Sequence, residues 1–211
     1  MRKPRLDRRR FLQTASAAAA VPAAASAAPE RWDEEPLAQV DRTWIGPAYW
    51  ANRYQDWELR EGKIRSRAED PNRELSTLAL LTRAVDPTAG AAYLSVKARK
   101  LSGGDGFCGF LIGAGAGKLD WRAAALVQQA GGTGGGMLAI WQSDGRLVFR
   151  DHTNEFQPLD YRNLQANVRR GMIQQDREVE LRLAIEAETG GTYQLTFSAL
   201  DEGGSELAVA T

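Results

Sequence analysis

Two residue types that often carry chemistry are scarce in this 211-residue chain, which contains one histidine and one cysteine. A single cysteine excludes an internal disulfide, and Cys108 lies in an apolar run, where we expect a buried, unreactive thiol. A metal site would have to be built almost entirely from carboxylates, so we expect no metal and no other cofactor in this chain. A Ser-His-Asp triad would have to use His152, and no Gly-x-Ser-x-Gly turn accompanies it. We therefore predict no catalytic residue, and we interpret Asp151 and His152 as a polar pair that caps a turn.

The formal net charge is zero, from 27 basic and 27 acidic side chains, but the charges are unevenly distributed. Residues 1–28 hold six of the basic side chains and one of the acidic ones, so residues 29–211 hold 21 and 26 and carry a net charge of −5. An acidic body argues against binding to a phosphate backbone, and we expect no nucleic-acid partner.

Residues 1–28 are interpreted as an export signal. Arg8, Arg9, Phe11 and Leu12 resemble the core of a bacterial twin-arginine signal, and an alanine-rich stretch follows them. Ala25 and Ala27 provide a small-x-small cleavage site. The stretch is too short and too alanine-rich for a stable membrane span. We expect the twin-arginine export machinery as a partner and a periplasmic or extracellular location. The alternative is a basic tail before a low-complexity helix.

The rest of the chain is divided into a polar linker at 29–41 and a β-sandwich domain at 42–211. Short apolar runs separated by glycine-rich connections are typical of antiparallel strands; they occupy 106–113, 121–128, 136–141 and 146–149. Asp144 and Gly145 predict a tight hairpin, because Asp-Gly provides the positive φ angles that such a turn needs. Further strands are expected at 55–59 and 63–67, joined by a turn at 60–62, and at 75–85.

Apolar and polar residues alternate with a period of two in three segments, which are 92–99, 179–188 and 192–199. This pattern predicts strands with one face in the core and one face in water, and residues 188–191 join the last two segments as a hairpin. The predicted fold class is therefore all-β, an antiparallel β-sandwich. The pattern does not decide between a short helix and an ordered loop at 154–176. Residues 201–205 predict a turn and 206–211 the start of a strand, which suggests a fragment whose last strand has an unpaired edge.

Candidate binding residues surround the glycine-rich loops. The Gly113–Lys118 segment fails as a phosphate-binding loop, because its spacing is too short and Leu119 replaces the hydroxyl residue that would hold magnesium. Six tryptophans suit carbohydrate recognition, which uses aromatic stacking faces with polar groups beside them. The candidate ligand-binding residues are Asp120, Trp121, Arg122, Trp141 and His152. The alternative is that Trp121 and Trp141 fill the core.

Six motifs together resemble one family: Ile45–Asn52, Gln55–Trp57, Leu80–Arg83, Gly109–Gly113, Asp120–Ala124 and Asp144–Leu147. They are similar to the N-terminal module of bacterial alkaline phosphatase D-like metallophosphatases, over about 42–211. The resemblance implies a jelly-roll sandwich of the concanavalin or laminin-G type, ahead of a catalytic domain that binds metal ions and hydrolyses phosphate esters. The family's metal-binding residues belong to that downstream domain, so no phosphatase residue is assigned to this chain.

Three functions follow as hypotheses. The first is an exported, non-catalytic accessory module of such a phosphatase, with the downstream domain as its partner and a glycan or cell-envelope ligand. The second is a stand-alone carbohydrate-binding module. The third is a glycan-cleaving enzyme of the same sandwich class, which needs two carboxylates about 5–10 Å apart in a cleft.

Overall fold

The computed structural model describes residues 37, 39–51, 53–67, 76–85, 90–101, 106–114, 135–151, 169–174 and 176–211. The chain divides into two units, Met1–Arg31 and Trp32–Thr211, and every described residue belongs to the second. Within the described residues the elements are antiparallel strands and one short 3-10 helix, η2 (Tyr54–Asp56). The all-β fold class predicted from the sequence is confirmed. The predicted strand at 121–128 lies outside the described residues.

The larger sheet has five strands in the order β5-β10-β11-β12-β9, and every neighbouring pair is antiparallel. Its strands are β5 (Ala91–Ala98), β10 (Val179–Ala187), β11 (Tyr193–Leu200), β12 (Glu206–Ala210) and β9 (Arg169–Gly171). The alternating segments of the sequence form β5, β10 and β11, and Leu183 pairs with both Leu94 and Phe197. A shift of one residue would turn these apolar rows to solvent, so burial of one face fixes this register.

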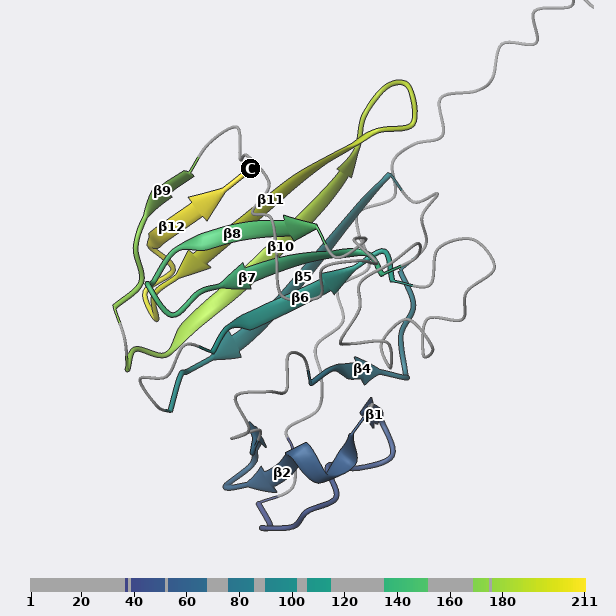
Figure 1. The fold of residues 1–211 in the computed structure, drawn as a ribbon, viewed down its shortest axis with the longest axis vertical. Helices are drawn as coiled ribbons and strands as arrows, with labels where there is room; N and C mark the ends of the chain where they lie inside the picture. The colour runs from purple at the N-terminus through teal and green to yellow at the C-terminus, as the bar shows by residue number, and fades with distance from the viewer. Residues whose placement is uncertain are drawn as a thin grey trace, which may run out of the picture. The chain divides into compact units, whose positions relative to one another are not determined.

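The smaller sheet consists of β6 (Cys108–Ile112), β7 (Met137–Trp141) and β8 (Leu147–Asp151). Figure 1 shows it lying over the larger sheet. Buried side chains of both sheets form one core cluster, with Trp141 and Phe149 on one side and Leu181 and Phe197 on the other. The two sheets therefore pack face to face as a β-sandwich.

Strands β7 and β8 are apolar on both faces, whereas apolar and polar rows alternate in β5 and β10 of the larger sheet. Their second row of side chains, Leu138, Ile140 and Val148, forms a separate buried cluster with Phe107 and Leu111 packed against it. This explains why the sequence of β7 and β8 shows apolar runs without alternation.

Two small sheets come from the first part of the described chain. One pairs β1 (Tyr49–Ala51) with β4 (Leu78–Leu80), and the other is the hairpin of β2 (Trp57–Arg60) and β3 (Lys63–Ser66). The turn of this hairpin has positive φ at Glu61 (51°) and Gly62 (68°), as a two-residue turn requires. Asp56 is buried and accepts a hydrogen bond from Ser76 Oγ at 2.9 Å, which ties η2 to the segment before β4.

Three predictions need correction. The strand expected at 75–85 is only β4, because a bend follows Leu80. A short helix or an ordered loop was expected at 154–176, but among the described residues of this segment Arg169–Gly171 form strand β9. The unpaired edge expected at the last strand is wrong, because β12 pairs with β11 on one side and with β9 on the other.

The Asp-Gly hairpin is confirmed in place but has a different geometry. Gly145 N donates to Gln142 O at 3.1 Å and Gln142 N donates to Arg146 O at 2.9 Å, so the connection has three residues. Of its residues only Gly145 has a positive φ, at 86°. Asp144 instead uses its carboxylate, which accepts a hydrogen bond from Arg146 N at 3.0 Å. Asp201–Ser205 repeats this pattern between β11 and β12, with Gly204 at 80°.

Candidate functional site

The face of β5, β10 and the first part of β11 that points away from the core is polar, whereas the same face carries the buried Leu200 and Val209 toward β12. The side chains of the polar part are exposed or half-buried, and we call this set the polar face. It consists of Tyr93, Ser95 and Lys97 of β5, Glu180, Arg182, Ala184 and Glu186 of β10, and Gln194, Thr196 and Ser198 of β11. Side chains two residues apart on one strand of such a face are about 6.6–6.8 Å apart.

Tyr93 is the exposed aromatic residue of this face. Its side chain is 59% exposed, and its hydroxyl donates a hydrogen bond to Glu186 Oε1 at 2.8 Å. That hydrogen bond, together with the negative charge of Glu186, raises the pKa of Tyr93, so the phenol remains protonated near neutral pH. Ala184 lies directly opposite Tyr93, and Glu186 is its diagonal neighbour across the strands. The ring is thus held by a partner on the next strand.

At the other end of the polar face, two carboxylates hold two cations. Glu180 accepts hydrogen bonds from Arg182 Nε at 2.8 Å and from Arg182 Nη2 at 3.2 Å. Glu178, which precedes β10 on the same side, accepts a hydrogen bond from Lys63 Nζ at 2.7 Å. Both contacts stabilise the ionised carboxylate, so the pKa values of Glu178 and Glu180 are lowered. Nearby Lys97 lowers both values further, and Arg99 lowers that of Glu178.

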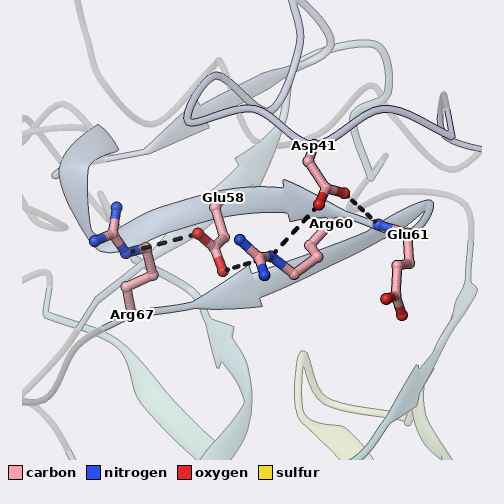
Figure 2. A network of polar contacts seen from close by, with 5 residues as sticks. All are labelled: Asp41, Glu58, Arg60, Glu61 and Arg67. Carbon is pink, nitrogen blue, oxygen red and sulfur yellow. Dashed lines mark hydrogen bonds and ion pairs between the residues drawn. The ribbon is translucent and has the colours of Figure 1, made fainter.

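A network of charged residues fixes the hairpin that carries Lys63 (Figure 2). Glu58 lies between Arg60 and Arg67, at 3.5 Å and 3.7 Å from their Nε atoms. Asp41 pairs with Arg60 at 3.8 Å and accepts a hydrogen bond from Glu61 N at 3.1 Å. Asp41, in the predicted linker, therefore contacts the turn at Glu61. Lys63 begins β3 two residues later and is itself held by its hydrogen bond to Glu178.

Glu178 and Glu180 are two residues apart on one face, which is a carboxylate spacing that glycoside hydrolysis can use. A general acid in that reaction needs a raised pKa, because it must hold its proton near neutral pH. Both pKa values are lowered, and each carboxylate is already bound to a cation. This pair therefore lacks the acid that such a mechanism requires.

A small cavity of about 100 Å³ lies at the connection between β7 and β8, lined by Phe107, Gln142, Ser143, Asp144 and Arg150. Beside it, the Lys100 ammonium lies over the Trp141 ring at 4.6 Å from the centroid and also donates to Gln142 O. Partial burial lowers the pKa of Lys100, and burial raises the pKa of the Cys108 thiol. Among the described residues, no group of three or more His, Cys, Asp or Glu side chains could hold a metal ion.

Of the five predicted ligand-binding residues, Asp120, Trp121, Arg122 and His152 lie outside the described residues. Trp141 is fully buried in the core, which agrees with the alternative that it is a core residue, and its ring is not a surface for stacking.

The export-signal residues Arg8, Arg9, Phe11 and Leu12 and the cleavage-site residues Ala25 and Ala27 also lie outside the described residues. The sequence did not identify the polar face as a site. In the sequence this face is visible only as the polar row that alternates with the apolar row in each strand. The contact between Tyr93 and Glu186 follows from the pairing of β5 with β10, which the sequence does not show.

Comparison of the chain with protein-family models, with curated proteins and with solved structures gave no match. Within the part of the chain that the structure describes, there is no helix of sufficient length and apolar character to span a membrane.

Proposed function

We propose that this chain is an exported, non-catalytic β-sandwich module that binds an extended polar ligand, such as a glycan of the cell envelope, on its polar face. The carrying observation is Tyr93, an exposed ring whose hydroxyl is fixed by Glu186 on a rigid sheet. A sugar ring can stack on an exposed aromatic side chain while neighbouring hydroxyl, amide and charged groups bind its hydroxyls. Ser95 provides such a group on β5, and Thr196 and Gln194 provide them on β11, across β10.

The resemblance to the N-terminal module of alkaline phosphatase D-like proteins supports an accessory role. In that role the module would hold an exported metallophosphatase close to its substrate, and the phosphatase would hydrolyse phosphate esters. Reading the coding sequence beyond the codon for Thr211 tests this part of the proposal. An open frame with clustered Asp, Asn and His codons supports it, and a stop followed by an unrelated gene contradicts it.

Binding is tested by titrating the purified chain with soluble polysaccharides of bacterial envelopes, measured by calorimetry. We expect Tyr93→Ala to weaken binding by about tenfold, because a lost aromatic contact of this kind costs about 1.4 kcal/mol. Tyr193→Ala is the matched control: it is also about half exposed, but it belongs to the other row of side chains. Equal effects of the two substitutions, or no binding by the unsubstituted chain, would refute the proposal.

A further inference from the structure

We infer that the polar face selects an anionic polysaccharide, bound through four side chains that we call the cationic end: Lys63, Lys97, Arg99 and Arg182. This inference rests on the proposed function and names the charge of the ligand. Lys97 lies on β5 directly opposite Glu180, and Arg99, just beyond the end of β5, is close enough to Glu178 to lower its pKa. Lys63 and Arg182 are held at Glu178 and Glu180.

The cationic end carries a local excess of positive charge. Four cations surround two carboxylates, which leaves two positive charges uncompensated. The excess lies at Lys97 and Arg99, which are exposed and form no ion pair within the described part of the chain. The body of the chain has a net charge of −5, so this excess is a local feature. An anion is therefore attracted to this end of the sheet.

The two paired cations also keep donors available for a ligand. Arg182 uses two of its five N–H groups on Glu180, and Lys63 uses one of its three on Glu178. The carboxylates thus orient these cations without consuming all their hydrogen-bonding capacity. Because the pKa values of Glu178 and Glu180 are lowered, both carboxylates stay ionised at neutral pH and hold the cations in place.

The spacing suits a polymer more than a single small anion. Lys97 and Tyr93 are four residues apart on β5, which corresponds to about 13 Å along the strand. A chain lying along β5 and β10 would meet the aromatic ring at one end and the cations at the other. The strands hold the backbones of Tyr93, Lys97 and Arg182 in fixed relative positions, so the ordering needed when the ligand binds is confined to side chains.

Dextran sulfate and neutral dextran test the inference, because they share one backbone and differ in charge. We expect tight, salt-sensitive binding of dextran sulfate by the full chain and much weaker binding of dextran. Lys97→Ala with Arg99→Ala should weaken the binding of dextran sulfate by roughly tenfold or more, because each cation near an anionic surface strengthens binding several-fold. The matched control is Arg83→Ala with Arg146→Ala, which removes two other exposed cations and changes the net charge equally. Lys97→Arg with Arg99→Lys keeps both charges and should bind as the unsubstituted chain does.

Two results would overturn the inference. One is an equal loss in the test and control pairs, which would mean that only net charge matters. The other is binding to phosphatidylglycerol vesicles that equals binding to dextran sulfate and depends equally on Lys97 and Arg99, which would assign the cationic end to a lipid surface. If neutral envelope polysaccharides still bind through Tyr93 while the charged pair has no effect, the proposed function stands and this inference falls. If neither kind of polysaccharide binds, both fall.

Discussion

Phe197 provides the most direct test of how the two sheets pack. It belongs to β11 of the larger sheet and is fully buried. Its ring lies edge-on to Phe110 of β6, with centroids 6.0 Å apart, and at a tilt to Phe149 of β8, at 6.3 Å. Phe197→Ala in such a core should cost about 3–5 kcal/mol of unfolding free energy. Phe197→Leu keeps most of the volume but loses two ring contacts of about 0.5–1.5 kcal/mol each, which gives about 1–3 kcal/mol.

These costs can be measured by urea unfolding followed through tryptophan fluorescence, since Trp141 reports on the same core. Phe197→Leu remains measurable if the alanine variant does not fold. Tyr193→Ala is the control, because Tyr193 is an aromatic residue of the same strand that is 51% exposed, and we expect it to cost less than 1 kcal/mol. Face-to-face packing through Phe197 would be refuted if Phe197→Ala destabilised the chain no more than Tyr193→Ala.

Three further predictions concern other parts of the fold. Gly145→Ala should lower the free energy of unfolding by about 1–3 kcal/mol, because Gly145 has a φ of 86° and an added Cβ would meet Ile173 O. Gly190 has a φ of 89° but open space around it, so Gly190→Ala should cost clearly less. Equal urea unfolding midpoints for the two variants would contradict this. The ion pairs of Glu178 and Glu180 stabilise the fold fully above the unfolded pKa of about 4.3, and this contribution is lost as the pH falls through their lowered folded pKa values. The urea unfolding midpoint should therefore fall less between pH 7 and pH 3 in the Glu178→Gln, Glu180→Gln double variant than in the unsubstituted chain. An equal fall in the two proteins would contradict this prediction. Because burial raises the pKa of Cys108, a thiol reagent at pH 8 should react slowly with the folded chain and fast in urea, and equal rates would show an accessible thiolate.

The strands that could be predicted from the sequence are those with strict alternation. In β10, Leu181 and Leu183 must point to the core, and this requirement excludes a slip of one residue against β5 and β11. The hairpin at Glu61 and Gly62 was predictable because Gly62 suits positive φ, although Glu61, which also has a positive φ, does not. The geometry at Asp144 was not, because its carboxylate bonds to a backbone N–H and leaves only Gly145 with a positive φ.

The pairing of β9 and the polar face could not be predicted, for two physical reasons. Strand β9 has three residues and ends at Gly171, which is too short for a period of two to be visible. Tyr93 and Glu186 belong to rows that resemble any solvated strand face, and 93 residues separate them in the chain. Only the pairing of β5 with β10 brings them into contact, and pairing partners far apart in sequence are not encoded locally.

The position of β12 between β11 and β9 has a consequence for the order of assembly during synthesis. Arg169–Gly171 leave the ribosome 35 residues before Glu206, yet β9 joins the described sheet only through β12. The hairpin of β10 and β11 can form as soon as it emerges, whereas β9 has no strand to pair with until Ala208–Ala210 have been made. The sheet is thus completed in an order that differs from the order of the chain, and a nascent chain halted after Leu200 would carry the segment of β9 without its partner.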